Sequence, residues 1–259
     1  FGAEQSKGDK QAEYMNALNR EFVQKHPDVA PLILCPTQYN KSWSGGSYLS
    51  DLGTTMDKDV RIMWTGATVV DMIDKTDMDW INAQIQRNAY IWLNYPVNDF
   101  CIDHMLMGPT YGNDLDIAEQ LSGFVSNPME YAEASKVSLY SIADYCWNME
   151  AYDSNTSWEQ ALQVLMPEHV EAFRVFCQHN VDLGPTGHGL RRQGESAAFK
   201  KSAEAFTSAM AKGYNAEAVA AMNKEFTTMV DAANELLTST EEPEMISEIT
   251  PWVEVMKII

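Results

Sequence analysis

The stretch YIWLNYPVNDF, residues 90–100, determines how the rest of the chain is interpreted. An apolar run rich in branched and aromatic residues ends at Asn94, and a Tyr-Pro pair, Asn98 and Asp99 follow it. Such a run is typical of a strand covered on both faces, as in a parallel sheet. The residues after it are aromatic, amide or acidic, without a basic group. That set suits a ligand with hydroxyl groups and a flat apolar face, such as a sugar.

Three similar runs accompany this one, and helical patterns alternate with them. The predicted strands are Pro31–Cys35, Val60–Trp64, Ala89–Leu93 and Leu121–Val125. Helices are predicted at 9–25, 77–87 and 127–147. In the first, Tyr14, Met15, Leu18 and Phe22 form one apolar stripe. In the second, Asp77 is a candidate cap at the amino end. Alternating strands and helices predict an α/β fold with a parallel sheet and right-handed crossovers.

Polar residues cluster directly after each predicted strand. Tyr39 and Asn40 follow the first, Thr65 follows the second, Asn94 the third and Asn127 the fourth. The carboxyl ends of parallel strands are where barrels and open α/β sheets place their sites. These residues are therefore expected to meet at one edge of the sheet.

Four strands are half of a (β/α)8 barrel of the TIM type. The chain starts at Phe1 with a loop and a helix, so residues 1–153 are predicted to be the second half of such a barrel, lacking the first half. An isolated half barrel would leave open sheet edges. From residue 154 onward the patterns are helical only, over 157–180, 195–213, 215–240 and after Pro243, which predicts a helical bundle domain at 154–259.

Composition excludes some partners. The 259 residues carry a formal net charge of −19, which argues against nucleic acid or an anionic membrane as a partner. No apolar run reaches the roughly 18 residues that a membrane-spanning helix needs. The cysteines, Cys35, Cys101, Cys146 and Cys177, are far apart in the sequence, which favours free thiols over a disulfide or a metal set.

Five motifs together resemble a known family. CPTQYNKSW, MWTG, YIWLNYPVND, LMGPTYGND and GFVSNPMEYAEASK are similar, in order and spacing, to the catalytic domain of glycoside hydrolase family 84, the β-N-acetylglucosaminidases that include O-GlcNAcases. The resemblance extends through the helical part to ITPWV near the end of the chain. It implies retaining hydrolysis of terminal β-linked N-acetylglucosamine, with the 2-acetamido group of the substrate as nucleophile. It implies no metal and no cofactor.

The resemblance also implies roles for individual residues. Tyr39 would hydrogen-bond near the acetamido oxygen and the anomeric centre. Thr65 and Trp92 would wall the acetamido pocket, and Val69 would line the entrance.

Three further residues would hold the sugar hydroxyls. Asn94 and Asp99 would bind them, with Asp99 at the 4- and 6-positions, and Asn127 would take the 3-hydroxyl. From the residues alone other roles stay open: Trp92 as core, Tyr39 as a packed loop residue, the two asparagines as turn residues and Asp99 as a helix cap.

One departure from the family is clear. Its two catalytic acids are adjacent aspartates, and no adjacent Asp-Asp pair occurs in the 259 residues. The match places the pair just upstream of Phe1, so this chain alone is expected to be inactive, with the amino-terminal barrel half as a required partner. The alternatives are an N-acetylglucosamine-binding pseudoenzyme and a non-catalytic fragment. The substrate would be an N-acetylglucosamine-containing glycan or glycoprotein, and bacterial members of the family suggest a secreted or periplasmic location.

Overall fold

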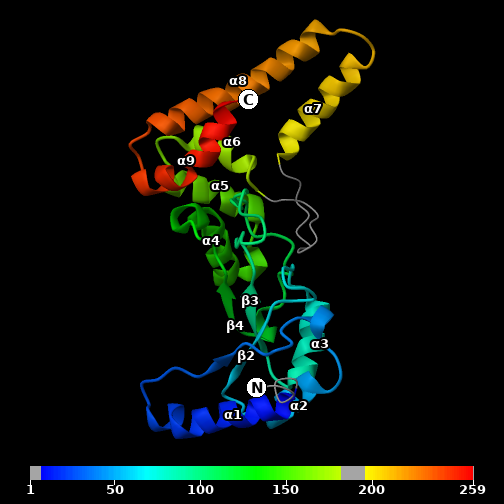
Figure 1. The fold of residues 1–259 in the computed structure, drawn as a ribbon, viewed down its shortest axis with the longest axis vertical. Helices are drawn as coiled ribbons and strands as arrows, with labels where there is room; N and C mark the ends of the chain where they lie inside the picture. The colour runs from blue at the N-terminus through cyan, green and yellow to red at the C-terminus, as the bar shows by residue number, and fades with distance from the viewer. Residues whose placement is uncertain (1–6, 182–195, 259) are drawn as a thin grey trace.

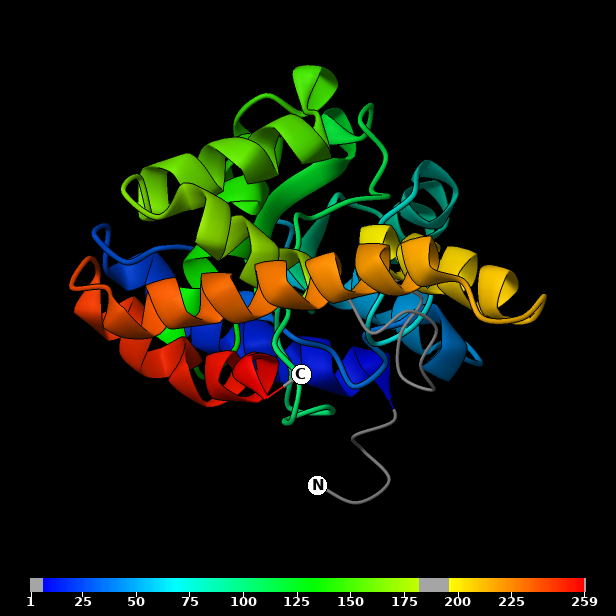
Figure 2. The ribbon, with the colours of Figure 1, turned by 90° about the horizontal axis from the view of Figure 1, so that it is seen from above.

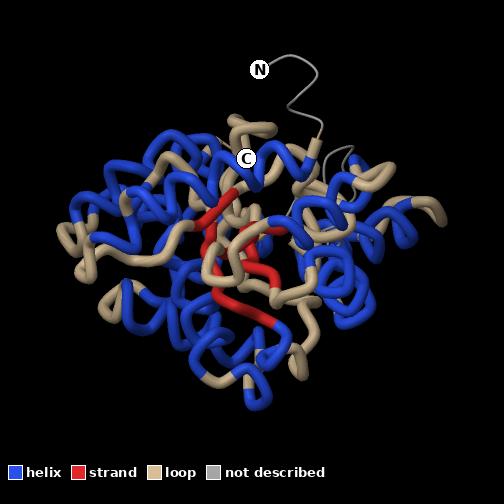
Figure 3. The backbone as a smooth tube through the Cα atoms, turned by 90° about the horizontal axis from the view of Figure 1, so that it is seen from below, coloured by secondary structure: helices blue, strands red, loops and turns tan. Residues whose placement is uncertain are grey.

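The computed structural model describes residues 7–181 and 196–258, and its centre is a parallel sheet. The strands are β1 (Ile33–Leu34), β2 (Arg61–Trp64), β3 (Ala89–Leu93) and β4 (Leu121–Ser126), hydrogen-bonded in the order β1-β2-β3-β4. The strands are parallel and sequential, with an α-helix between β1 and β2 and another between β2 and β3, which is the α/β arrangement that the alternating patterns predict. The connection from β3 to β4, all of it described, is a long loop that contains only one 3-10 turn, Ala118–Gln120. Figure 3 shows the strands near the middle of the molecule, with helices around them.

Nine helices of at least eight residues lie in the described part of the chain. Three belong to the first strand–helix units and six follow β4: α1 (Gly8–Glu21), α2 (Tyr48–Thr55), α3 (Lys75–Ile85), α4 (Ala132–Trp147), α5 (Ser154–Leu165), α6 (Val170–Gln178), α7 (Ala197–Met210), α8 (Ala216–Thr238) and α9 (Pro243–Lys257). None of the described helices is both long enough and apolar enough to cross a bilayer.

The two faces of the sheet differ in how they are covered. In β3 the residues Ala89, Ile91 and Leu93 are fully buried, whereas Tyr90 and Trp92 are only partly buried. Side chains alternate between faces along a strand, so the first set packs beneath the helices and the second lies on a less covered face, here called the open face. The register pairs Tyr90 with Met63 of β2 and Trp92 with Val125 of β4, two further partly buried residues on that face.

An incompletely covered inner face fits half of a barrel. In a closed barrel the inward-facing side chains from all strands fill the interior, and here strands on one side only supply them. β1 and β4 are the edges of the described sheet. The parallel-sheet α/β class and the helical carboxyl-terminal region are as predicted, and the domain boundary at 153/154 stays a prediction.

Several predicted helices differ in detail from the structure. The helix predicted at 77–87 begins at Lys75, and its cap is Asp74, whose side chain accepts a 2.7 Å hydrogen bond from the backbone N–H of Asp77. The prediction of Asp77 as the cap is therefore wrong. The helix predicted at 157–180 is two helices, α5 and α6, with Pro167 in the break, because proline cannot donate the hydrogen bond that a helix interior requires.

Most of the predicted apolar stripe of α1 does not face the core, although Met15 packs against it. Tyr14, Leu18 and Phe22 are 69%, 47% and 49% exposed, and the buried residues of α1 include Ala12 and Asn16. At 3.6 residues per turn, these exposed residues lie about 100° around the helix axis from the buried residues. They therefore form one side of the helix, here called the flank of α1, and do not face the core. A neighbouring helix could cover such a flank.

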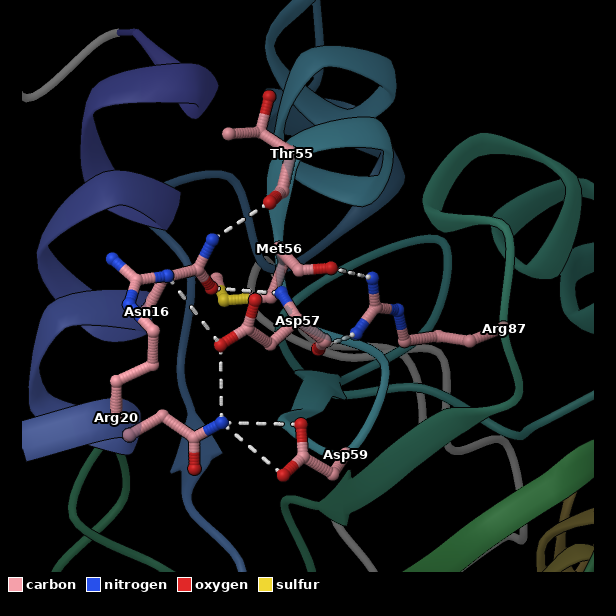
Figure 4. Close-up of polar contacts among 8 residues, drawn as sticks. Asn16, Arg20, Thr55, Met56, Asp57, Asp59 and Arg87 are labelled. Atoms are coloured by element: carbon pink, nitrogen blue, oxygen red, sulfur yellow. Dashed lines mark hydrogen bonds and ion pairs between the residues drawn. The ribbon is translucent and has the colours of Figure 1, made fainter. Parts of the chain in front are cut away.

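A polar cluster at the amino ends of the strands holds α1, α2 and β3 together (Figure 4). The guanidinium of Arg87 donates to the carbonyls of Gly53, Met56, Asp57 and Val60 at 2.7–2.9 Å. Figure 4 shows the bonds to Met56 and Asp57. Asn16 of α1 donates to the carbonyl of Thr55 at 2.8 Å. These contacts satisfy carbonyls at the end of α2 and in the loop that leads to β2.

The carboxyl-terminal helices form a separate packed group. α8 packs along α6, α7 and α9, and α4 joins this group to the sheet through its contacts with α5 and α9. Figure 1 shows α7 and α8 projecting as a hairpin away from the sheet, and Figure 2 shows α8 and α9 side by side. Met229, Ala233 and Leu236 of α8 are buried here, so this side of the helix is part of the core.

Candidate functional site

Three candidate residues lie at equivalent positions on neighbouring strands. Each is the first residue after its strand: Thr65 follows β2, Asn94 follows β3 and Asn127 follows β4. Each stands two positions beyond a residue of the open face, namely Met63, Trp92 and Val125. Because side chains alternate along a strand, all three are placed on the open face at the carboxyl end of the sheet. The backbone N–H of Asn127 donates to the carbonyl of Leu93 at 2.9 Å, which extends the β3–β4 ladder to the tip.

A chain of hydrogen bonds connects three of the seven candidates, and a fourth, Thr65, is bonded to the same loop. The Asn127 amide Nδ2 donates to Oδ1 of Asn94 at 3.0 Å, and Nδ2 of Asn94 donates to the carbonyl of Val69 at 2.7 Å. The Thr65 hydroxyl donates to the carbonyl of Thr68 at 2.9 Å, in the same loop as Val69. Asn94 is 8% exposed and Thr65 is 1% exposed, so their orientations are fixed by the surrounding structure. A preformed polar tip of this kind is what a binding site requires.

Tyr39 comes to the same end of the sheet from the loop after β1. Its carbonyl accepts from the backbone N–H of Thr65 at 2.9 Å, and Lys41 N–H donates to the carbonyl of Gly66 at 3.1 Å. The Tyr39 ring packs edge-on against Trp43, with ring centroids 5.0 Å apart. The ordinary pKa of a tyrosine, 10.0, already keeps the phenol of Tyr39 protonated at neutral pH, and desolvation by burial raises this pKa further.

Asp99 is placed in a loop and not at the start of a helix. The segment after it consists of turns, with Cys101 N–H donating to the carbonyl of Asn98 at 2.9 Å, so its alternative role as a helix cap is excluded. Asp99 is exposed, and among the described residues it makes no hydrogen bond to the other six candidates. Trp92 is partly buried on the open face, where a ligand ring could contact it, and is not part of the core beneath the helices.

Two buried carboxylates beneath these tips were not predicted as site residues. Asp71, 6% exposed, accepts from backbone N–H groups of the loop after β2. Asp77, 4% exposed, accepts from the Trp64 indole at 2.6 Å, and its other oxygen lies 3.6 Å from Nζ of Lys41. Desolvation raises the pKa of both carboxyls. For Asp71 the sequence signal available was an acid in an otherwise apolar, small-residue stretch soon after a strand; Asp77, in the polar stretch DKTDMDW, offered no such signal.

A cavity of about 700 Å³ lies elsewhere, between α6, α8, α9 and the loop after β3. Its lining is mainly apolar, with Phe176, Phe226 and Trp252 among the side chains, and it contains none of the seven candidates. The four cysteines are free thiols, and of these only Cys177 is fully buried.

Residues 2–178, more than half of the chain, match the family of β-N-acetylglucosaminidases, and residues 195–259 match the bacterial GH84 post-catalytic domain. The chain belongs to glycoside hydrolase family 84. The family resemblance inferred from the five motifs is confirmed.

Solved structures of GH84 proteins share the fold. The CpGH84B structure superimposes with a TM-score of 0.87 at 30% identity, covering 98% of this chain and 45% of that one. An O-GlcNAc hydrolase mutant from Thermobaculum terrenum gives a TM-score of 0.85 at 26% identity, covering 97% of this chain and 53% of the other.

Among characterised proteins, the O-GlcNAcase of Rattus norvegicus is 26% identical over 135 residues. That match covers 50% of this GH84 chain and 15% of the rat protein. The chain thus spans about half the length of the solved GH84 structures and a small part of the rat enzyme.

Proposed function

We propose that this GH84 chain is the sugar-holding part of a retaining β-N-acetylglucosaminidase that uses the acetamido group of its substrate as nucleophile. The observation that carries the proposal is the set of Thr65, Asn94 and Asn127 on one face at the strand tips, oriented by hydrogen bonds and beside Trp92. Neutral amide and hydroxyl groups can hydrogen-bond to sugar hydroxyls without changing their own protonation state. An indole offers a flat apolar surface to the sugar ring.

The proposed roles divide the site into two parts. Tyr39, Thr65 and Trp92 form the acetamido side, with Val69 at the entrance. Attack by the acetamido group on the anomeric carbon would give a cyclic oxazoline intermediate. A close, partly aromatic pocket excludes water from this intermediate until one of the two catalytic carboxylates activates a water molecule.

The hydroxyl side of the site consists of Asn94, Asp99 and Asn127. Asn94 and Asn127 each use one amide atom in the bond between them, which leaves further donor and acceptor capacity for a ligand. Asp99, exposed on its loop, would reach the 4- and 6-hydroxyls on ligand binding.

The two catalytic acids are proposed to come from outside these 259 residues. Substrate-assisted hydrolysis needs one carboxylate to polarise the acetamide and a second to protonate the leaving oxygen. No adjacent aspartates occur in the sequence, and the open face and the exposed flank of α1 are surfaces that further strands and helices could complete. The chain alone is therefore expected not to hydrolyse its substrate, an N-acetylglucosamine-containing glycan or glycoprotein.

Hydrolysis of 4-methylumbelliferyl N-acetyl-β-glucosaminide tests this proposal. The 259-residue chain is compared with a form extended upstream of Phe1 by the first half barrel, with the corresponding glucoside as control substrate. Turnover by the extended form only, and only of the N-acetyl substrate, is expected. Turnover by the 259 residues alone would refute the missing-acid proposal. No turnover by either form would refute the enzyme proposal.

The alternative is an N-acetylglucosamine-binding protein without catalysis. It is favoured by one observation, since the three strand-tip candidates are all neutral. Titration calorimetry with N-acetylglucosamine and with glucose separates the cases when no turnover is found. Selective binding of the N-acetyl sugar by an inactive extended form would establish the binding protein.

A further inference from the structure

The loop between β2 and α3 is built around the carboxylate of Asp71. Oδ2 of Asp71 accepts from the backbone N–H groups of Ala67 and Thr68, the latter at 3.2 Å. Oδ1 accepts from the N–H of Met72 at 2.9 Å. Three converging backbone donors form an anion-binding concavity, and the anion here is a side chain of the loop itself.

Gly66 allows the loop to close on this carboxylate. Its φ of +114° is a conformation that residues with a Cβ rarely adopt. A Cβ at Gly66 would also lie 2.6 Å from Cβ of Asp71 and 2.7 Å from Oδ2. The path of the backbone from Gly66 to Thr68 is thus matched to Asp71.

The opposite side of the same loop touches the candidate site. The Val69 carbonyl accepts from Nδ2 of Asn94, which fixes which way the Asn94 amide faces, and Oδ1 of Asn94 in turn accepts from Asn127. The Thr65 hydroxyl is held by the carbonyl of Thr68. The loop is also joined to the β1 tip, since Ser42 N–H donates to the carbonyl of Ala67 at 2.9 Å.

We propose that Asp71 is a positioning residue. Through the loop at residues 66–70 it would fix the shape of the acetamido pocket and the orientation of Asn94. The three hydrogen bonds to the Asp71 carboxylate come from the backbone of Ala67, Thr68 and Met72, and none of these is a candidate residue, so Asp71 acts on the site through the loop backbone. The proposal rests on the proposed N-acetylglucosaminidase function, because it assigns Asp71 an effect on how that site selects its N-acyl group.

The substitutions that test this role are Asp71→Ala and Asp71→Asn. Alanine removes all three acceptor contacts. Asparagine keeps the shape but replaces one carboxylate oxygen with an NH2 group that cannot accept, so at least one backbone N–H loses its partner. The matched control is Asp153→Ala, because Asp153 accepts from Thr156 N–H at 2.8 Å as the cap of α5, away from the strand tips.

The first measurement is selectivity in the extended, activity-competent form. kcat/KM is determined for the N-acetyl and N-propanoyl forms of the fluorogenic substrate. Asp71→Ala is expected to raise the propanoyl-to-acetyl ratio by about 10-fold, the scale on which one methylene is discriminated, and Asp71→Asn by less. Asp153→Ala is expected to leave the ratio at the wild-type value although it also lowers stability.

The second measurement does not need activity. The side-chain 1H–15N resonances of Asn94 and the backbone amides of Ala67 and Thr68 are followed by NMR in the same variants. Asp71→Ala is expected to shift the Asn94 side-chain signals and to accelerate hydrogen exchange at both amides.

The outcomes separate the two proposals. Faster exchange at Ala67 and Thr68 with unchanged Asn94 signals and an unchanged substrate ratio would make Asp71 a turn stabiliser only, and the proposal would be overturned. A wild-type protein that hydrolyses neither substrate would refute the proposed function. The Asn94 signals would still decide whether Asp71 controls its orientation.

Discussion

Asp77 is a buried carboxyl whose protonation affects stability. Desolvation raises its pKa above the ordinary value of 3.8, although the Trp64 indole and Lys41 partly oppose that effect. The folded protein therefore holds the proton over a pH range in which the unfolded chain has released it. The stability that follows is fully present below pH 3.8 and is lost as the pH rises through the folded pKa.

Asp77→Asn removes this titration but keeps an oxygen for the Trp64 indole. We expect the difference in free energy of unfolding, wild type minus variant, to shift in favour of the wild type as the pH falls from about 8 to about 4. Urea denaturation across that range measures it. A difference that is constant with pH, or that shifts towards the variant at low pH, would contradict the raised pKa.

The side-chain amide of Asn127 donates a single 3.0 Å hydrogen bond to Oδ1 of Asn94 and so helps to orient it. In Asn127→Asp a carboxylate oxygen would face Oδ1 of Asn94, and two acceptors repel. We expect kcat/KM of the extended form to fall by about 10- to 100-fold, with a change in stability of about 1 kcal/mol or less. Asn155→Asp, at an exposed position in α5, is the control. Unchanged kcat/KM in Asn127→Asp would remove Asn127 from the site.

At the scale of elements, three of the four strands were predicted closely. β3 has the predicted bounds, and β2 and β4 differ from the prediction by one residue, because a short run of branched and aromatic apolar residues is typical of a buried strand. The first strand is shorter than predicted, since β1 covers only Ile33–Leu34 of the predicted Pro31–Cys35. α2 was not predicted, since YLSDLGTT is short and half polar or small. It is packed by tertiary contacts with α1 and α3, which local sequence does not reveal.

The candidate site divides in the same way. The position of Thr65, Asn94 and Asn127 at the strand tips follows from the pattern of residues. The contact of Asn94 with the Val69 carbonyl does not, because its acceptor is a backbone atom whose place depends on the loop fold. The role of Asp71 depends on the positive φ of Gly66, and a lone Gly in sequence does not specify its φ.

Arg87, just before β3, binds carbonyls at the end of α2 and in the loop that leads to β2, and Figure 4 shows two of these bonds. A lysine would carry the charge but could not serve four carbonyls with the planar fork of a guanidinium. We expect Arg87→Lys to lower the free energy of unfolding by about 2–4 kcal/mol, without changing kcat/KM of the folded extended form.

Arg20→Lys is the matched control for this substitution. Arg20 is a surface residue with Nη1 3.9 Å from Asp57, so its replacement is expected to change stability by about 0.5 kcal/mol or less. Chemical denaturation compares the two variants. Equal effects on stability would show that the carbonyl contacts of Arg87 contribute little.

At the scale of the whole molecule, the open face and the flank of α1 are where the barrel is incomplete. Tyr14, Leu18 and Phe22 form an exposed apolar stripe about 100° from the buried side of their helix. In a closed barrel each helix packs against neighbours on both flanks, and α2 occupies one flank of α1. The proposed first half barrel would supply the helix on the other flank.

Leu18→Glu distinguishes a covered flank from a solvated one. In the 259-residue chain the glutamate would be exposed, so we expect little change in stability and less binding of a hydrophobic dye. In the extended form it would be buried without a partner, at a cost of about 1–3 kcal/mol in unfolding free energy. Val164→Glu, on a 63% exposed position of α5, should be tolerated in both forms. Equal effects of Leu18→Glu in the two forms would mean that nothing upstream packs on this flank, and the barrel would then have to close in another way.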